Sequence, residues 1–290
     1  MRKYTKAILD REFPTDDACL DFIFKARWPN GVTCKKCGKV TKHFRIRSKK
    51  AYSCEFCGTL VSPTATTIFH KSELSLRSWF YAIFLMAQTR TGVASMQLER
   101  ELGVNHRTAL RMFRQIRSLM GDGSTTLSGA VEADETYVGG KRPGKRGRGA
   151  AGKVIVFGMV ERGGKAYTEV TPDVKAATLL SIIQEHIPTD PQTTIYTDEM
   201  SSYNGLVRLG YAHLSVNHAA EEYVNGKAHT QTVDSLWSNT KRGIDGVNHS
   251  VTPRYLQTYL DSYVWRYNHR KDEQPMFQTL LGKAAKPVGE

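Results

Sequence analysis

The 290-residue sequence contains no apolar run long enough to cross a bilayer; its best candidate, residues 79–87, is too short. Its first residues, Met1-Arg-Lys-Tyr-Thr-Lys, contain no apolar core of the kind that a secretory signal peptide requires. These absences argue against a membrane partner and predict a cytoplasmic location. An apolar content of 40% excludes disorder along the whole chain.

Acidic residues are few beside basic ones, with 28 Asp and Glu against 41 Lys and Arg and a net charge of +13. This excess favours a polyanionic partner, because basic side chains that neutralise phosphates release counterions. Charge alone does not separate DNA from RNA or from an anionic membrane surface. Nucleic acid is the partner we expect from it.

Cysteine is also scarce, and the odd count of 5 argues against a disulfide framework. Two C-x-x-C pairs stand on either side of residues 38–53, and a glycine follows each pair directly. Four thiolates at this spacing predict a tetrahedral structural Zn²⁺ site that has no open position for water. The expected ligands are Cys34, Cys37, Cys54 and Cys57.

No acidic residue occurs between Thr33 and Lys50, within and after the first cysteine pair. This makes the ribbon a candidate for phosphate contact, and a merely solvated basic surface is the alternative. The basic side chains are those of Lys35, Lys36, Lys39, Lys42, Arg45, Arg47, Lys49 and Lys50.

Residues 92–114 have the helix, glycine turn, helix rhythm of a helix-turn-helix. Asn105 is a suitable N-cap for the second helix, and its inner face is expected to hold Leu110, Phe113 and Ile116. Arg107, Arg111 and Arg114 project together from another face of that helix. Three arginines on one face suit a DNA groove.

The pattern changes after a linker-like tract, residues 121–126, and becomes that of an α/β domain. Upstream of it we expect helices over 10–28 and 75–89. Downstream we expect strands over 131–138, 153–160, 166–170, 193–196 and 212–216, and helices over 174–186, 202–209, 232–242 and 253–268.

Three carboxylates occupy positions that suggest chemistry. Asp134 lies inside a mainly apolar strand, Asp198 just past a strand end, and Asp234 at the start of an amphipathic helix. A carboxylate in an apolar strand is costly unless it is paired or metal-bound. Brought together, the three residues could hold two Mg²⁺ or Mn²⁺ ions, which prefer oxygen ligands and support in-line phosphoryl transfer.

Other carboxylates remain alternatives at two of these positions. Glu132, on the same strand face as Asp134, or Glu135 could be the ligand in its place. Glu222 competes with Asp234. Asp234 is preferred because a helix bearing Trp237 and Lys241 follows it.

Over nearly its whole length the chain resembles insertion-sequence transposases of the ISXO-like group, which have an N-terminal zinc ribbon and an RNase H-like DDE domain. The resemblance rests on the four cysteines and on Asp134-Glu-Thr-Tyr-Val-Gly-Gly-Lys141, Thr197-Asp198-Glu-Met-Ser-Ser-Tyr203, Asn217-His218 with Glu222-Tyr-Val224, His229-Thr-Gln-Thr-Val-Asp-Ser-Leu-Trp-Ser238 with Lys241-Arg242-Gly243, and Tyr255-Leu256 to Arg266-Tyr-Asn268.

This resemblance implies that Asp134 and Asp198 are the first two catalytic carboxylates. The family's third position, usually Glu or Asn, falls on Asp234, which keeps the charge but is one methylene shorter than Glu. Lys241 corresponds to a basic residue that faces DNA near the site, and we group the adjacent Arg242 with it.

The implied function is that of an insertion-sequence transposase, which cuts element ends and joins the 3′-hydroxyl ends to target DNA. Its partner would be double-stranded DNA, both the terminal inverted repeats and the target, in the nucleoid. Two element ends imply a homodimer or larger assembly on DNA. The alternatives are a non-catalytic zinc-ribbon and helix-turn-helix regulator and an RNase H-like DNA nuclease.

A glycine-rich basic loop, residues 139–152, joins the first two strands of the catalytic domain and contains no acid. It is predicted to become ordered over DNA phosphates, and an idle solvated loop is the alternative. Its basic residues are Lys141, Arg142, Lys145, Arg146 and Arg148.

The expected organisation is an N-terminal helical segment, a zinc ribbon, a helix-turn-helix module, an RNase H-like mixed-sheet catalytic domain of the α/β class, and a C-terminal tail. The corresponding ranges are 1–29, 30–65, 73–122, 128–275 and 276–290.

Overall fold

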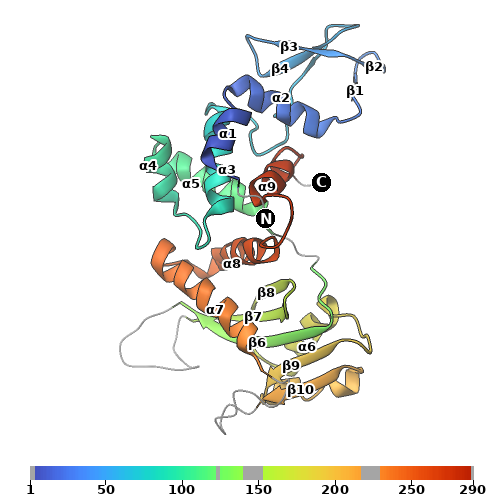
Figure 1. Ribbon diagram of the computed structural model, residues 1–290, viewed down its shortest axis with the longest axis vertical. Helices are drawn as coiled ribbons and strands as arrows, with labels where there is room; N and C mark the ends of the chain where they lie inside the picture. The colour runs from blue at the N-terminus through green and yellow to red at the C-terminus, as the bar shows by residue number, and fades with distance from the viewer. Residues whose placement is uncertain (1–3, 122–124, 140–152, 217–228, 289–290) are drawn as a thin grey trace. The chain divides into compact units, whose positions relative to one another are not determined.

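The computed structural model describes residues 4–121, 125–139, 153–216 and 229–288 (Figure 1). The chain divides into two compact units. Unit 1 comprises Met1–Thr89, Val93–Leu119 and Lys271–Glu290, and unit 2 comprises Arg90–Gly92 and Met120–Arg270. Unit 2 is therefore inserted into the sequence of unit 1. Among the described residues, no helix combines the length and the apolar character needed to span a membrane.

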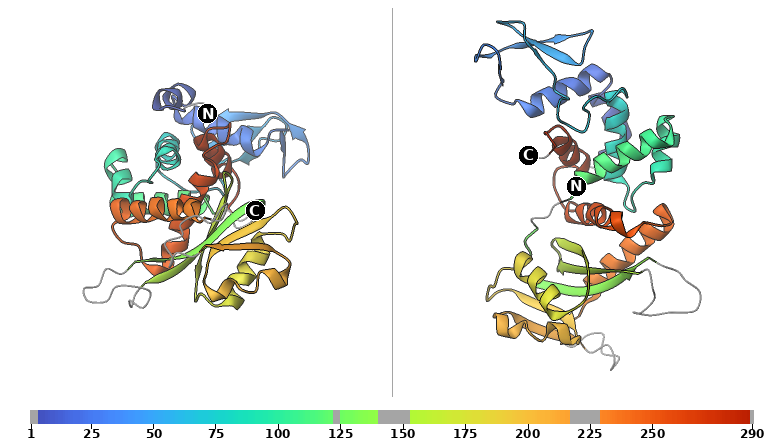
Figure 2. Two further views of the ribbon diagram at one scale, coloured as in Figure 1. Left: turned by 60° about the horizontal axis from the view of Figure 1, so that its bottom comes forward. Right: turned by 180° about the vertical axis from the view of Figure 1, so that it is seen from behind.

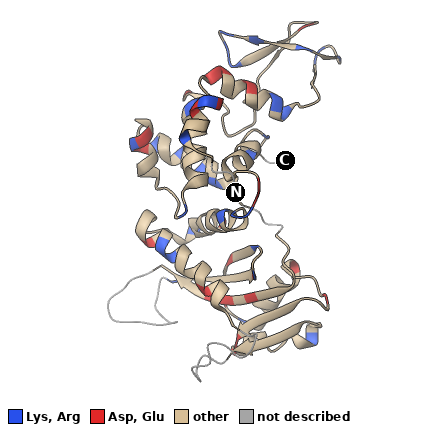
Figure 3. Ribbon diagram, viewed as in Figure 1, with Lys and Arg blue, Asp and Glu red and all other residues tan. Residues whose placement is uncertain are grey.

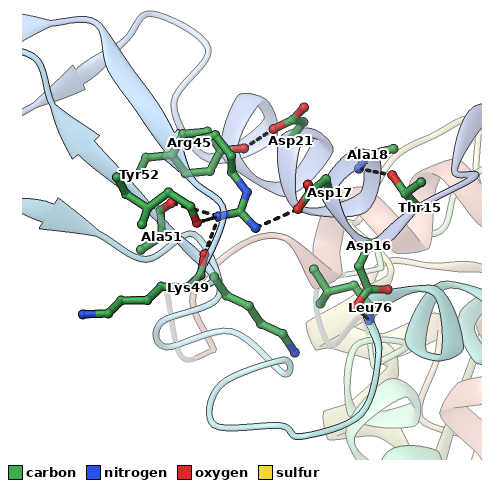
Figure 4. A network of polar contacts seen from close by, with 12 residues as sticks. Thr15, Asp16, Asp17, Ala18, Asp21, Arg45, Lys49, Ala51, Tyr52 and Leu76 are labelled. Atoms are coloured by element: carbon green, nitrogen blue, oxygen red, sulfur yellow. Dashed lines mark hydrogen bonds and ion pairs between the residues drawn. The ribbon is translucent and has the colours of Figure 1, made fainter.

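The ribbon of unit 1 consists of short antiparallel strands, and one face of its larger sheet packs on a helix. The Tyr52 ring stacks on Phe24 with 4.1 Å between ring centroids. The Arg45 guanidinium donates to Asp17 at 2.7 Å, and the Tyr52 hydroxyl donates to Asp21 (Figure 4). The strands are β1 (Val32–Thr33) paired with β2 (Val40–Thr41), and β3 (His43–Ile46), β4 (Ala51–Cys54) and β5 (Leu60–Val61) in that order.

Two helices precede the ribbon, α1 (Lys6–Glu12) and α2 (Asp16–Arg27), so the helical segment expected over 10–28 is present but interrupted between residues 12 and 16. Pro14 disfavours helical backbone at the residue before it. The Thr15 side chain then caps a new helix by accepting from the backbone N–H of Ala18 at 3.2 Å.

Three helices follow the ribbon: α3 (Leu76–Gln88), α4 (Ser95–Leu102) and α5 (His106–Ser118). Gly103, at φ 61°, ends α4 in the left-handed region that glycine tolerates. Asn105 caps α5 by accepting from the N–H of Thr108 at 2.9 Å. The expected helix pair is present, although Leu110 is only half-buried; the buried side chains of α5 are those of Ala109, Met112, Phe113, Ile116 and Arg117.

The last segment contains a helix where the sequence suggests a tail. Helix α9 (Met276–Ala284) packs on α3. Its Phe277 is 0% exposed, with ring centroids 4.7 Å from Tyr4 and 5.9 Å from Phe84. Because Phe277, Leu280 and Leu281 are buried in unit 1, the chain's C-terminal segment completes the core that its N-terminal segment begins.

Unit 2 is built on a five-stranded mixed sheet in the order β10-β9-β6-β7-β8. Strands β6, β7 and β8 are antiparallel neighbours, whereas β9 runs parallel to β6 and β10 runs parallel to β9. This order and these directions confirm the expected RNase H-like α/β fold. The strands are β6 (Ala130–Val138), β7 (Val154–Glu161), β8 (Ala166–Thr171), β9 (Thr194–Asp198) and β10 (Ala212–Val216).

Helices cover both faces of this sheet (Figures 1 and 2). On one face Val131 and Ala133 pack with α6 (Ala176–His186). On the other face Val156 and Val160 pack with α7 (Gln231–Gly243) and α8 (Pro253–Asn268), and a π-helical turn, Ile244–Asn248, joins those two helices. The helix expected over 202–209 is instead two 3-10 turns, Ser201–Tyr203 and Val207–Leu209.

Candidate active site and metal clusters

The four paired cysteines form one cluster, with sulfur atoms that all lie within 4.8 Å of one another. The Sγ atoms of Cys34 and Cys57 are 3.4 Å apart, and those of Cys37 and Cys54 are 3.9 Å apart. Each pair lies on a tight turn closed by a glycine with positive φ, which is 69° at Gly38 and 71° at Gly58. The arrangement offers one metal ion four sulfur ligands.

Hydroxyl groups beside the cluster favour the thiolate forms of two of its cysteines. The Thr41 hydroxyl lies 3.2 Å from Cys54 Sγ, and this hydrogen bond is the largest cause that lowers the pKa of Cys54, to about 6. The hydrogen bond with Thr59 likewise lowers the pKa of Cys57. Thiolates are the forms that bind metal.

Two of the ribbon's basic side chains take part in the fold. Arg45 is hydrogen-bonded to Asp17 and to backbone carbonyl groups of its own hairpin. Lys50 Nζ donates to the carbonyls of Ser72 at 3.3 Å and Leu74 at 3.2 Å. The side chains left for phosphate contact are the exposed Lys35, Lys36, Lys39, Lys42, Arg47 and Lys49.

The three arginines predicted to enter a DNA groove, Arg107, Arg111 and Arg114, are all exposed on α5. The helix buries its opposite side in unit 1. Their shared face therefore remains accessible within this unit, which is the geometry that groove contact requires.

The predicted carboxylates of unit 2 lie where the two central parallel strands separate. Pairing between β6 and β9 stops at Glu132 and Tyr196, two residues before Asp134 and Asp198. Beyond that point, carboxylate oxygens of Asp134, Asp198 and Glu135 all lie within 4.8 Å of one another. Acidic residues recur along β6 and occupy the adjoining end of α7 (Figure 3).

The environment of Asp134 is strongly unfavourable to a lone negative charge. Burial, followed by the charge of Glu135, raises the pKa of Asp134 to about 7, and the charges of Asp234 and Asp198 act in the same direction. The Trp237 indole N–H donates to Asp134 Oδ2 at 2.9 Å and opposes this rise. A bound cation would favour the ionised carboxylate and offset the mutual repulsion.

Asp234 lies on the exposed side of the first turn of α7. It is not among the three residues whose oxygens lie within 4.8 Å, but its charge still acts on Asp134. Lys241 and Arg242 are exposed in the last turn of the same helix. One helix thus presents an acidic end beside Asp134 and a basic end two turns away.

The two alternatives to Asp134 have different outcomes. Glu132 lies outside the carboxylate cluster and is 0% exposed, and both of its carboxylate oxygens accept hydrogen bonds from protein groups. Glu135 belongs to the cluster, which it joins from the other side of β6, where it accepts from the Tyr203 hydroxyl at 3.0 Å. Its position directly after Asp134 is the signal that pointed to it.

Several predicted positions lie outside the described residues. They are Asn217, His218 and Glu222, and the loop residues Lys141, Arg142, Lys145, Arg146 and Arg148.

An RNase H-like sheet with clustered carboxylates where its central strands separate defines the class of RNase H-like nucleases and transposases. The chain matches the models of the ISXO2-like transposase domain over residues 126–268 and of the transposase zinc-ribbon domain over residues 14–59. It belongs to the ISXO2-like transposase family.

Two relatives agree with this assignment. An uncharacterized protein in transposable element ISH50 of Halobacterium salinarum is 28% identical over 299 residues, which cover 94% of this chain and 98% of that protein. An uncharacterized transposase-like protein of Haemophilus influenzae is 32% identical over 110 residues, which cover 36% of this chain and 82% of that protein.

Solved structures that are similar to the chain include two of interest here. The catalytic core domain of BIV integrase has a TM-score of 0.32 and 14% identity, covering 51% of this chain and 86% of that one. A pre-cleavage Mos1 transpososome has a TM-score of 0.27 and 11% identity, covering 71% of this chain and 79% of that one.

Proposed function

We propose that this transposase cuts DNA at the ends of its insertion sequence and joins the resulting 3′-hydroxyl ends to target DNA. The observation that carries the proposal is the convergence of Asp134 and Asp198 where β6 and β9 separate, beside the helix that presents Asp234. In this proposal Asp134 and Asp198 are the first two catalytic metal ligands, and Asp234 is the third.

The residues fit hard divalent cations, because their donors are all carboxylate oxygens. Mg²⁺ or Mn²⁺, when bound, would activate the attacking water or 3′-hydroxyl and stabilise the leaving oxygen. Trp237 fixes one oxygen of Asp134 and leaves the other for a ligand bond. Glu135, which accepts a hydrogen bond from the Tyr203 hydroxyl, could supply a further oxygen ligand.

The DNA contacts are divided among several parts of the chain. Arg107, Arg111 and Arg114 on α5 would enter a groove of the terminal inverted repeat. Lys241 and Arg242 would contact phosphates near the cut site, as would the lysines of the ribbon and the basic loop over 139–152. The ribbon's cysteines would hold Zn²⁺ in a structural role, since four sulfur ligands leave no position for a substrate.

Two element ends must be processed together, so we propose a homodimer or larger assembly on DNA in the nucleoid. In this proposal, unit 1 of each copy, which includes α9, binds the terminal repeat. The proposed catalytic domain, residues 128–275, lies within unit 2 up to Arg270.

The test uses the purified full chain and a labelled oligonucleotide duplex that carries the element's terminal repeat. With Mg²⁺ the chain should cut the end and join it to a target plasmid. Asp198→Asn should lower both reactions on the order of 10³-fold, since metal-held groups supply several kcal/mol, while the affinity for the duplex stays unchanged. Glu185→Gln, at an exposed position on α6, is the matched control and should keep full activity.

Each other outcome has a definite meaning. Cleavage by Asp198→Asn at the normal rate would remove this residue from the mechanism. A wild-type chain that binds the repeat without cutting would favour the regulator, and cutting without joining would favour a nuclease.

A further inference from the structure

Glu132 is a fully buried carboxylate that the proposed chemistry leaves without a role. It is 0% exposed and lies on β6, on the same face as Asp134. Burying a carboxylate costs several kcal/mol unless hydrogen bonds and an opposite charge compensate for it. Its partners therefore indicate what it holds in place.

Those partners come chiefly from the start of α7. Glu132 Oε2 accepts from the backbone N–H groups of Thr232 at 2.7 Å and Val233 at 3.0 Å. Glu132 Oε1 accepts from the Thr232 hydroxyl at 2.9 Å and from Arg162 Nε at 2.7 Å. The first N–H groups of any helix lack partners within the helix, so a side chain of β6 caps α7 from outside.

The helix has no such cap of its own. Its N-cap residue, Thr230, makes no side-chain hydrogen bond to the helix. Arg162, which pairs with Glu132, also donates to the carbonyl of His229 at 2.8 Å, and its guanidinium lies 3.9 Å from the ring centroid of Tyr196. Glu132 and Arg162 thus fix both the first turn of α7 and the residue that leads into it.

Strand β6 holds α7 at a second point one turn further along. The Trp237 indole donates to Asp134, and its ring passes directly over Gly158 on β7, where an added Cβ would lie 2.4 Å from the ring. Glu132 and Asp134 thus contact α7 at its start and at Trp237. Asp234, directly after Val233, lies between these two attachments.

We propose that Glu132 is a positioning residue, which caps α7 from β6 and thereby sets the place of Asp234 relative to Asp134 and Asp198. It does not itself bind the metal ions. The inference rests on the proposed role of Asp234 as the third ligand. Loss of an outer group that orients a metal ligand typically costs 10- to 100-fold in metal affinity or activity.

The experiment measures Mn²⁺ affinity of the full chain and Mn²⁺-dependent cleavage of the terminal-repeat duplex. Glu132→Gln keeps the shape of the side chain but replaces one carboxylate oxygen with an amide NH₂ group. That group cannot accept the hydrogen bonds that the oxygen accepts. It should raise the Mn²⁺ concentration for half-maximal cleavage about tenfold or more. The exposed Glu185→Gln should leave that concentration unchanged.

Cleavage of the protein backbone by bound Fe²⁺ and peroxide reports where the metal lies. In the wild type, cuts should fall near Asp134, Asp198 and Asp234. In Glu132→Gln, the cuts near residues 134 and 198 should persist, and those near 234 should weaken. An unchanged pattern with an unchanged Mn²⁺ requirement would overturn the proposal, even if the variant is less stable.

A double-mutant cycle separates this inference from the proposed function. If Glu132 acts through Asp234, adding Glu132→Gln to Asp234→Asn should produce no further loss of Mn²⁺ affinity. A wild-type Mn²⁺ affinity in Asp234→Asn alone would refute the third-ligand assignment. Further loss in the double variant would instead refute the positioning role.

If Glu132→Gln does not fold, Thr232→Val provides the same test more gently. It removes one of the hydrogen bonds to Glu132 Oε1 and keeps both backbone bonds to Oε2. It should raise the Mn²⁺ requirement several-fold, and a wild-type requirement with a normal Fe²⁺ cutting pattern would contradict the proposal.

Discussion

The cysteine cluster and the carboxylate cluster both bring together groups that could hold metal ions, but they are assembled in opposite ways. All four cysteines come from one short stretch, residues 34–57, on two turns that local hydrogen bonds close. Asp134, Asp198 and Asp234 come from two strands and a helix, and the whole of unit 2 brings them near each other. We therefore expect the small ribbon to depend on its metal for folding, whereas the carboxylates are positioned by the fold of unit 2.

The largest expected effect is on the ribbon. Replacing Cys37 and Cys57 with Ser should remove the zinc and unfold residues 30–62, because a structural zinc site contributes on the order of 10 kcal/mol to folding. Binding to the terminal repeat should weaken, and hydrogen exchange in β6 and β7 should not change. Zinc content and peptide-resolved exchange measure these effects. A ribbon that stays protected without zinc would contradict the comparison.

The sequence predicted the local cluster more completely than the remote one. Cysteine spacing and the following glycines identify the ribbon, because those residues contact one another along a short segment. Asp134 and Asp198 were identified by their places in strands and by family resemblance. Whether Glu132 faces a metal or a helix end depends on where α7 begins in space, which no local sequence pattern encodes.

The helices differ in the same way, according to whether a local or a remote contact defines them. The break between α1 and α2 has a local signal in Pro14 and Thr15. By contrast, the sequence suggests a tail where α9 lies, because the position of Phe277, against Tyr4 and Phe84, depends on a contact with distant parts of the chain. No local pattern reports such a contact.

The packing of Phe277 against Tyr4 and Phe84 predicts the second-largest effect, which is on the stability of unit 1. Phe277→Ala should destabilise unit 1 by about 3–5 kcal/mol, the usual cost of emptying a buried aromatic site. Hydrogen exchange in α3 should rise while that in β6 does not. The control is Phe44→Ala in the same unit, where the residue is 55% exposed and the expected change is within about 0.5 kcal/mol. Equal effects of the two changes would show that α9 is not part of this core.

Repulsion within the carboxylate cluster should make the stability of the metal-free chain depend on pH. Because the pKa of Asp134 rises from 3.8 to about 7 on folding, the folded state retains a proton that the unfolded state has lost. The metal-free chain should therefore lose stability as pH rises from about 4 to about 7, with no further loss from this group above that. Asp134→Asn should be more stable than the wild type at pH 8 in EDTA and equally stable near pH 4. Thermal unfolding at both pH values tests this, and the opposite order at pH 8 would contradict the electrostatic account.

Mg²⁺ should reverse this dependence, because it binds the ionised form. Mg²⁺ affinity should fall as pH drops below about 7 in the wild type. An affinity that is independent of pH between 5 and 8 would mean that Asp134 is not a ligand.

The smallest expected effect concerns side-chain length at the third position. Asp234→Glu should retain activity or raise it by a few-fold, since Glu restores the reach of one methylene while keeping the charge. Initial rates of Mg²⁺-dependent cleavage measure this. An inactive Glu variant, beside an active wild type, would direct attention to Glu222 as the third ligand.

The most direct test of the account is a crystal structure of the chain with Mn²⁺ and a terminal-repeat duplex, with the ions located by their anomalous scattering. The account predicts Mn²⁺ between oxygens of Asp134 and Asp198, with a carboxylate oxygen of Asp234 in the coordination shell. Ions bound elsewhere, or an Asp234 that stays clear of every ion while the DNA end is seated, would contradict it.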